Sequence, residues 1–228
     1  GNRQSRVLAV QAKRRASIAG LSLIEGNGVG APQSGEGAGA LNAEGSHFSV
    51  VDSVLRNNTN GNNFGGAIRD RDGATLVLRN STLMDNHGVG AIAIGFDAVL
   101  IATSSTISRN LVRNAGALYF NRARGEVSHC TITDNVGFDF AVGVEGDPGV
   151  SVENSVIARN QSGDLAGDQP GTPVSRGHNL IGNPGAVTGF TQPGDQTGTA
   201  ANPIDPKLSP LAIHSGQVPT QMPLAGSP

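Results

Sequence analysis

The residues that could carry chemistry are carboxylates in turns that follow short Gly-Ala-Leu or Gly-Ala-Ile phrases. Two of these turns hold a pair of acidic residues two places apart, and a third turn adds one more acidic residue. These residues are Asp70 and Asp72, Asp97, and Glu145 and Asp147. Stacked carboxylates would supply the oxygen ligands that Ca²⁺ prefers. However, Arg122 and Arg124 lie between them in the chain and could neutralise them directly. A Ca²⁺ site, a catalytic acid cluster and a solvated, salt-bridged loop face therefore all stay open.

A repeated six-residue phrase must position these turns. It consists of a small residue, any residue, Ile or Leu, two polar residues and then Asn, and a degenerate copy ends at Asn27. The closing asparagines of the other copies are Asn58, Asn86, Asn110, Asn135 and Asn160. Including Asn27, the copies are spaced 24 to 31 residues apart. A period in this range is typical of a solenoid, in which one unit is too thin to bury its own apolar face.

Each repeat predicts three short strands with alternating apolar residues. In one repeat they are centred on Gly66-Ala67-Ile68, on Leu76-Val77-Leu78 and on the phrase that begins at Ser81. Thirty-three Gly and twelve Pro favour many short strands joined by turns over long helices. A leucine-rich repeat would need a Leu-x-x-Leu-x-Leu phrase and a helical stretch, which the repeats lack. The sequence therefore predicts an all-β parallel β-helix with three short strands per coil.

Stacking the copies assigns a role to each column of the phrase, because equivalent residues in successive coils lie about 4.8 Å apart. The apolar position should form an inward column: Leu55, Leu83, Ile107, Ile132 and Ile157. The small residue two places earlier has the same parity and should also face inward, where hydroxyl groups can bond neighbouring coils. That column contains Ser53, Ser81, Ser105, Cys130 and Ser155. Cys130 is therefore interpreted as a small core residue and not as a nucleophile.

The closing asparagines are expected to form a ladder at a turn, because Asn tolerates left-handed backbone and its amide can bond the coils on both sides. The residue before each Asn alternates in charge. The four residues in order are Asp85, Arg109, Asp134 and Arg159. We expect a surface ion-pair column, in which each exposed pair contributes roughly 0–1 kcal/mol.

Residues 1–160 are assigned to the coils, and residues 161–228 to incomplete coils and an irregular capping segment of the same domain. The first strands are expected within Ser5–Val10 and Arg15–Ile18. The later segment is rich in Gly, Pro, Asp, Gln and Thr. A β-helix must cover its last coil, because an open end exposes apolar core and unpaired strand edges.

Composition excludes several classes of partner. The formal net charge of −2 argues against nucleic acid or an anionic membrane recognised through bulk electrostatics. No apolar run approaches the ~18 residues of a transmembrane helix. No signal-peptide pattern opens the chain, which suggests a mature or excised fragment, or a cytosolic protein.

The C-terminal phrases resemble a known family. Ser175-Arg-Gly-His-Asn-Leu-Ile-Gly182 and Asn202-Pro-Ile-Asp-Pro-Lys-Leu-Ser-Pro-Leu211 are similar to elements of bacterial choice-of-anchor Q proteins. The closing segment, His214 to Pro228, is similar too. The resemblance implies a right-handed parallel β-helix of the pectate-lyase-like superfamily, located outside the cell or on its surface. It implies no activity.

Enzymes on this fold would be expected to show further motifs. Polysaccharide lyases combine Ca²⁺-binding acids with an Arg or Lys base, yet no lysine occurs between Lys13 and Lys207. Polygalacturonase-like hydrolases would show clustered Asp pairs with Gly-His-Gly and Arg-Ile-Lys phrases, and these are missing. Aromatic residues for sugar stacking are sparse: Phe96, Tyr119, Phe120, Phe138 and Phe140.

The leading functional expectation is a non-catalytic extracellular or cell-surface structural or adhesive module. Exposed coil ends or loops could support self-association, end to end or laterally. The rival is a carbohydrate-active enzyme, foremost a Ca²⁺-dependent polysaccharide lyase. Passive glycan binding without turnover is a third class, and Ca²⁺ is the cofactor that these alternatives could require.

Overall fold

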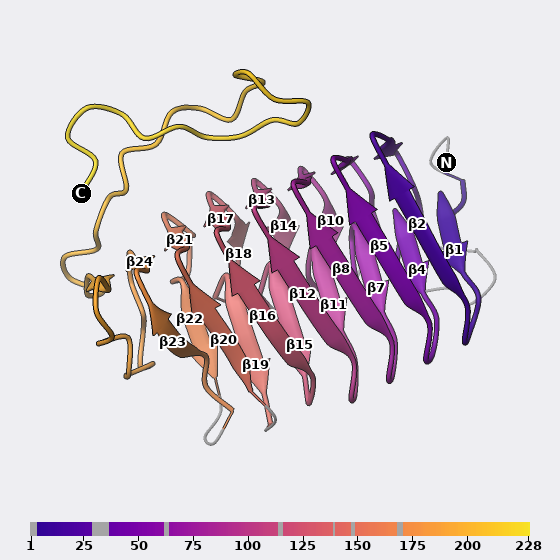
Figure 1. Ribbon diagram of the computed structural model, residues 1–228, viewed down its shortest axis with the longest axis horizontal. Coiled ribbons are helices and arrows are strands. Elements are labelled where there is room, and N and C mark those ends of the chain that lie inside the picture. The colour runs from indigo at the N-terminus through magenta and orange to yellow at the C-terminus, as the bar shows by residue number, and fades with distance from the viewer. Residues whose placement is uncertain are drawn as a thin grey trace.

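The computed structural model describes residues 4–28, 37–61, 64–113, 116–138, 140–146, 149–167 and 171–228. Asp147 lies outside these ranges. All regular elements in the described part of the chain are β-strands, which wind as a right-handed parallel β-helix. Figure 1 shows successive coils side by side along the long axis, from the N-terminus to the C-terminal segment. The predicted fold class is confirmed.

Three sheets run the length of the rod, one for each predicted strand. Sheet A contains β1 (Leu8–Val10), β4 (Ala40–Asn42), β7 (Ile68–Asp70), β11 (Ile92–Ile94), β15 (Leu118–Asn121), β19 (Val142–Glu145) and β22 (Leu165–Gly167). Sheet B contains β2 (Arg15–Ala19), β5 (His47–Val51), β8 (Thr75–Arg79), β12 (Val99–Thr103), β16 (Arg124–Ser128), β20 (Val150–Glu153) and β23 (Val174–Gly177). Sheet C contains β3 (Ser22–Ile24), β6 (Val54–Arg56), β9 (Thr82–Met84), β13 (Thr106–Ser108), β17 (Thr131–Thr133), β21 (Val156–Ala158), β24 (Leu180–Ile181) and β25 (Gln196–Thr197).

A fourth, short sheet was not predicted. Sheet D consists of β10 (His87–Gly88), β14 (Leu111–Val112) and β18 (Val136–Gly137), directly after the closing asparagines. Two-residue strands carry too little alternation to be recognised in a sequence. Their parallel pairing becomes visible only when neighbouring coils are stacked in space.

The core is a set of apolar columns inside the rod. The predicted inward column is fully buried from Leu55 to Ile157, and the in-register pairing continues it to Leu23 and Ile181. Burying each such side chain stabilises the fold by about 1.5–3 kcal/mol. Alternation in sheet B, as in Leu76 and Leu78, sends a second set of side chains into the same core.

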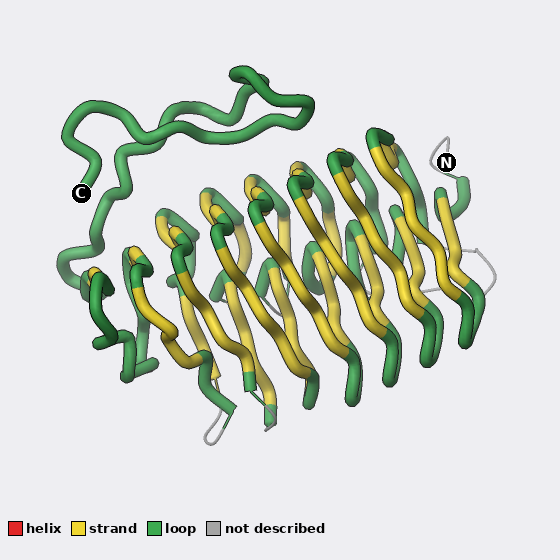
Figure 2. Tube along the Cα trace, in the orientation of Figure 1, coloured by secondary structure: helices red, strands yellow, loops and turns green. Residues whose placement is uncertain are grey.

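The C-terminal residues cover one end and one face of the rod. Val187 and Phe190 join the core cluster beyond the last coil. Residues 206–228, here called the arm, fold back on themselves through bridges between Leu208 and Pro223 and between Ala212 and Thr220. Figures 1 and 2 show the arm as an irregular segment that runs back along the coils on the side of sheet C.

The arm explains why outward-facing residues of sheet C are buried. Thr82 and Thr133 have no exposed surface, although they flank inward-pointing residues. The Thr82 hydroxyl donates to the Pro219 carbonyl at 2.6 Å, and the Thr133 hydroxyl donates to Gln221 Oε1. Sheet C is therefore the face of the rod that the arm covers.

Candidate functional site

The asparagine ladder runs along the rod at the buried turn that joins sheet C to sheet D, and it is confirmed. Each Asn side chain donates from Nδ2 to the Oδ1 of the Asn one coil further on, at 2.9–3.0 Å from Asn58 to Asn160. The same Oδ1 also accepts the backbone N–H of the preceding Asn, as Asn110 does from Asn86 at 3.0 Å. Nδ2 also donates to a carbonyl of the previous coil, as from Asn110 to Leu83. The Oδ1 and Nδ2 groups of these amides are therefore used in hydrogen bonds that hold neighbouring coils together.

The left-handed backbone lies one residue earlier than expected. Asn58 and the later ladder asparagines are not among the residues with positive φ, whereas the residues before them are, from Asn57 at 55° to Arg159 at 59°. The ladder requires the Asn side chain to point inward, and the preceding residue makes the turn that allows this. The preference of Asn for left-handed backbone is therefore the wrong explanation for this column.

The column of small residues bonds adjacent coils as predicted. The Ser81 hydroxyl accepts the Ser53 N–H at 3.1 Å and donates to the Arg79 carbonyl at 2.8 Å. Cys130 occupies the same position with its thiol buried, and burial raises its pKa to about 11. That thiol is a poor nucleophile near neutral pH.

The Asn ladder ends on one aspartate that sequence reasoning did not identify. The Ser column ends on another, by way of Asn179, whose Oδ1 accepts the Ser155 N–H at 3.1 Å. Asp164 accepts from Asn160 Nδ2 at 2.7 Å and from the Asn183 N–H, and burial raises its pKa to about 6. Asp195 accepts from the Asn179 N–H and Nδ2, both at 3.0 Å. Neither aspartate belongs to a repeated phrase, so no pattern singled them out.

The charge column forms two separate ion pairs. Arg109 binds Asp85 through two nitrogens, at 3.0 and 2.7 Å, and Arg159 binds Asp134 at 2.8 Å. Asp134 also accepts from Gln221 Nε2 of the arm at 2.9 Å. The second pair therefore serves as a docking point for the arm.

The acidic residues proposed as a Ca²⁺ site occupy different environments. Asp70 ends β7 with its side chain directed into the core, because alternation along the strand sends Arg69 outward. It accepts from Asn42 Nδ2 at 2.6 Å, its Oδ2 has no hydrogen-bond partner, and burial raises its pKa to about 8. The assignment of Asp70 to a loop face is wrong.

The remaining acids lie at turns or on the outer side of sheet A. Asp97 is exposed and adopts a left-handed φ of 57° in the A–B turn, while Asp72 is half-buried. Glu145 Oε2 accepts from the Tyr119 hydroxyl at 2.6 Å. Among the described residues, no three His, Cys, Asp or Glu side chains lie close enough together to hold a metal ion. Asp147 lies outside the described residues, so the five-residue site stays a prediction.

The most distinctive cluster is on the outer side of sheet A. The Arg69 guanidinium carbon lies 4.7 Å from the centre of the Phe64 ring, and Phe64 lies parallel to Tyr119 with 6.5 Å between centroids. Gly95 provides room beside it, since an added Cβ would lie 2.7 Å from Asp72 Oδ1 and 3.0 Å from Arg69 Nη2. Burial and the Glu145 contact raise the pKa of Tyr119, so its hydroxyl stays protonated and donates.

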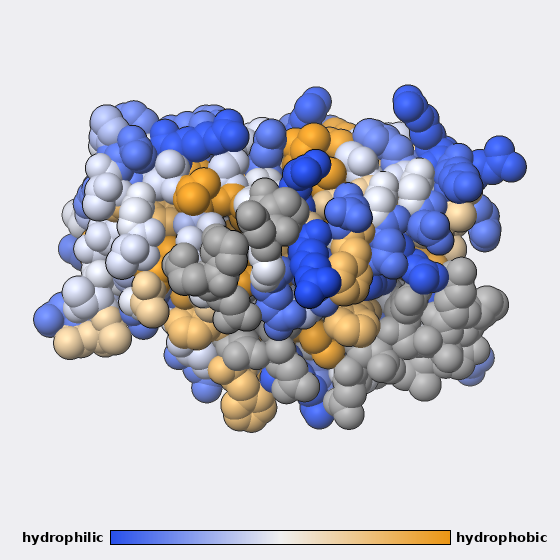
Figure 3. Space-filling model, turned by 90° about the horizontal axis from the view of Figure 1, so that it is seen from below, coloured by the Kyte–Doolittle hydropathy of each residue, from blue (hydrophilic) through white to orange (hydrophobic). Residues whose placement is uncertain are grey.

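A second pair extends this cluster. The Arg122 guanidinium lies 5.5 Å from the centre of the Phe96 ring, and Phe64 and Phe96 are each about two-fifths exposed. We call Phe64, Arg69, Phe96, Tyr119, Arg122 and Glu145 the aromatic–arginine face. Figure 3 shows strongly hydrophilic groups beside hydrophobic ones in the middle of the surface seen from below the rod. Of the aromatic residues considered for sugar stacking, Phe120 is fully buried in the core instead.

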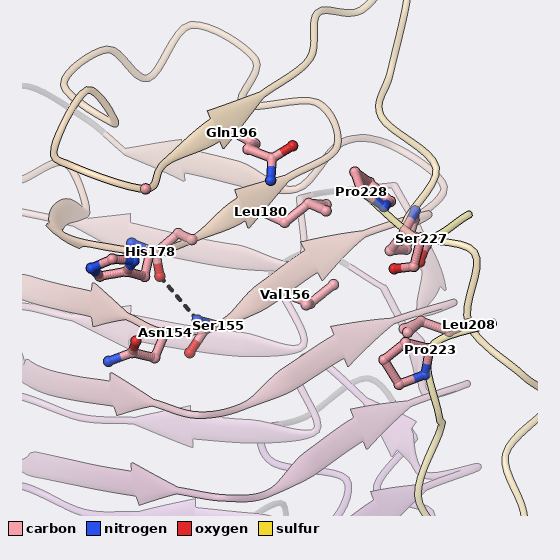
Figure 4. A pocket seen from close by; sticks show the side chains of 13 residues that line it. Asn154, Ser155, Val156, His178, Leu180, Gln196, Leu208, Pro223, Ser227 and Pro228 are labelled. Carbon is pink, nitrogen blue, oxygen red and sulfur yellow. Dashed lines mark hydrogen bonds between the residues drawn. The ribbon is translucent and has the colours of Figure 1, made fainter. Parts of the chain in front are cut away.

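A separate groove lies between sheet C and the arm (Figure 4). Val156, Leu180 and Gln196 form its floor in register, one from each of three coils. Its volume is about 240 Å³, with Asn154 and His178 along one side. His178 is the one histidine among its lining residues, which include no Asp, Glu, Lys or Arg. The groove therefore lacks an acid–base pair.

The comparison with protein families agrees with this architecture. A family model described as "Right handed beta helix region" matches residues 67–183, slightly more than half of the chain. The protein belongs to the right-handed β-helix family. Searches of curated proteins and of solved structures found no match. As a member of the right-handed β-helix family, the chain carries most of its ladder, of its core columns and of the aromatic–arginine face within the matched coils, while Asn58, Leu55 and Phe64 precede them. Among the described residues, no helix has the length and apolar character needed to cross a bilayer.

Proposed function

We propose that this right-handed β-helix is a non-catalytic structural or adhesive module of an extracellular or cell-surface protein. The narrower resemblance to choice-of-anchor Q proteins belongs to this proposal. Its physical basis is rigidity, because the side-chain ladders and parallel sheets connect every coil to the next. A rod of this kind holds side chains from distant parts of the sequence at fixed spacing along one surface.

The aromatic–arginine face is the observation that supports adhesion. It presents partly exposed aromatic rings beside guanidinium and carboxylate groups, and its members come from several coils. Aromatic faces pack against the C–H groups of sugars, while arginine and carboxylate groups bond hydroxyls. Its acids and bases contact one another or aromatic rings, an arrangement that suits binding better than proton transfer.

A binding and turnover experiment tests this proposal. The protein is incubated with pectate, alginate and glycosaminoglycans, with and without Ca²⁺, while absorbance from unsaturated products is followed. In parallel, retention on a glycan array is measured for the wild type and for Phe64→Ala and Arg69→Gln. We expect retention without product, and weaker retention for both variants.

The control substitution is Arg79→Gln, an exposed residue at the end of β8 next to the turn into sheet C. It should leave retention unchanged. Sustained product formation that Asp72→Ala abolishes would instead support the rival, a Ca²⁺-dependent polysaccharide lyase, and would refute a non-catalytic module.

A further inference from the structure

The peptide bond between Asp205 and Pro206 joins two anchored segments, the C-terminal coils and the start of the arm. On the rod side, the Ile204 N–H donates to the Gly182 carbonyl at 3.1 Å. On the arm side, the Lys207 carbonyl accepts an N–H from within the arm at 2.8 Å. Breaking this one peptide bond would therefore separate the arm from the coils without cutting through either of them.

The side chain of Asp205 is exposed and folds back along the chain. Its Oδ1 accepts the Lys207 N–H at 2.9 Å, in a turn that brings the carboxylate over the peptide bond to the next residue. Lys207 itself has a left-handed φ of 45°, a strained conformation for a residue other than glycine. The carboxylate is therefore held beside a strained stretch of backbone.

An aspartate followed by proline has a distinct reactivity. In other aspartyl peptides the next backbone nitrogen can attack the side chain and form a succinimide, but proline has no N–H with which to do so. The proline nitrogen is also more basic than an ordinary peptide nitrogen, so it is the better leaving group under acidic conditions. A carboxylate that is held beside such a bond can act as an intramolecular nucleophile.

We propose that Asp205 cleaves the Asp205–Pro206 bond under mildly acidic conditions and thereby releases the arm. A carboxylate oxygen of Asp205 bonds to the carbonyl carbon of the same residue, which forms a cyclic anhydride. The bond from that carbon to the Pro206 nitrogen breaks, and the nitrogen takes a proton from solvent. Water then opens the anhydride, so the reaction consumes one water molecule and changes no oxidation state.

The new chain end at Pro206 favours separation. Pro206 is buried and lines the groove between sheet C and the arm, and cleavage turns its nitrogen into a charged amine. Burying a charge without a partner is costly. The side chains at this junction are basic: Lys207, His178 in the same groove, and Arg159, which donates to an arm carbonyl at 3.4 Å. Asp134 is already paired with Arg159, so these groups supply no negative charge to balance the amine.

After cleavage, only non-covalent contacts hold the arm to the coils. They include the hydrogen bonds from Thr82 to Pro219 and from Thr133 to Gln221. In the intact chain the covalent tether keeps the arm at a high effective concentration, and cleavage removes this advantage. The arm then dissociates on dilution and uncovers the outer face of sheet C. The aromatic–arginine face contains no residue of the arm, so the cleavage does not depend on the adhesive function.

Intact mass spectrometry of the full chain tests the proposal. The protein is incubated at pH 7, 5 and 4, with and without concentrated urea, and circular dichroism identifies the folded samples. We expect fragments 1–205 and 206–228, which together exceed the mass of the chain by one water molecule. Cleavage should accelerate as the pH falls, because the proline nitrogen leaves in its protonated form. At one pH, the folded chain should be cut about tenfold faster than the chain in urea, because the fold holds the carboxylate in place.

Asp205→Asn is the decisive variant, because its amide oxygen can still accept the Lys207 N–H while the nucleophilic carboxylate is lost. It should remain intact at this bond. The matched control is Asp147→Asn, which alters the other Asp–Pro pair of the sequence and should leave cleavage at Asp205 unchanged.

Size-exclusion chromatography of the cleaved protein should separate fragment 206–228 from the coils. The proposal is overturned if no such fragment forms, if Asp205→Asn is cut equally fast, if urea does not slow the cleavage, or if the fragment stays with the coils. Each of these results leaves retention on a glycan array unaffected, so the two proposals fail separately.

Discussion

At the residue scale, the buried carboxyl group of Asp70 gives the protein a predictable pH dependence. Its folded pKa is raised from 3.8 to about 8 by burial. The folded state therefore binds the proton more tightly than the unfolded state, and this contribution to stability is complete below pH 3.8 and lost as the pH rises through about 8. Between these values the free energy of unfolding should fall by up to about 1.4 kcal/mol per pH unit.

Replacing Asp70 with Asn should remove this slope, since an amide cannot ionise and its oxygen can still accept from Asn42. Urea unfolding at several pH values measures the effect. Asp70→Asn should match the wild type near pH 4 and become increasingly more stable towards pH 8. Parallel pH profiles for the two proteins would show that Asp70 does not hold a proton in the core.

The ladder asparagines predict a second effect at the residue scale. Asn110→Ala removes the acceptor for both the side-chain and the backbone N–H of Asn86, inside a fully buried turn. Leaving buried polar groups unpaired should lower the free energy of unfolding by about 3 kcal/mol. Chemical denaturation tests this, with exposed Asn202→Ala as a control that should change stability by less than about 0.5 kcal/mol. Equal effects of the two substitutions would argue against the ladder as a stabilising element.

At the element scale, the arm is held to sheet C mainly by polar contacts. Gln221 contacts both Thr133 and Asp134, while Ile213, Met222 and Leu224 remain largely exposed. With few buried apolar groups, the arm should open more easily than the coils. Its contribution therefore lies in covering one face more than in the global stability of the rod.

Gln221→Ala should loosen the arm without unfolding the coils. Hydrogen–deuterium exchange should accelerate at the amides of Ala212 and Thr220, which bond each other within the arm. The free energy of unfolding should change by about 1 kcal/mol or less. Met222→Ala, whose side chain is 47% exposed, is the control and should leave exchange unaltered. Faster exchange in sheet C strands with an unchanged arm would contradict this picture.

At the scale of the whole molecule, the strands of each coil pair only with those of the neighbouring coils, so the cost of a core cavity should depend on position along the rod. Leu83 and Leu23 occupy the same column, but β9 pairs with strands on both sides while β3 is the edge strand of sheet C. Leu83→Ala should cost about 3–4 kcal/mol and Leu23→Ala about 2 kcal/mol. Thermal or urea unfolding of the two variants compares the same chemical change directly. A larger loss for Leu23→Ala would mean that the first coil is the more important for stability.

The repeat was readable from the sequence because its physical requirements recur at every coil. Stacked parallel strands need an inward Ile or Leu and an inward Ser, and the turn needs an Asn, so each requirement appears about every 25 residues. Alternation along a strand then determined which residues form the core. The order of the three main sheets and the position of the Asn column followed from the coil repeat and from the two-residue alternation along each strand.

The site depended on contacts that do not repeat. Phe64 meets Tyr119 two coils away. Asp70 turns inward because β7 continues two residues beyond Ile68, where the sequence pattern had placed a turn. Likewise, the arm buries Thr82 through a residue 137 positions later in the chain. A periodic sequence determines which residues stack on one another. Only the tertiary structure decides which loops and faces meet, because those contacts join unlike residues at irregular separations.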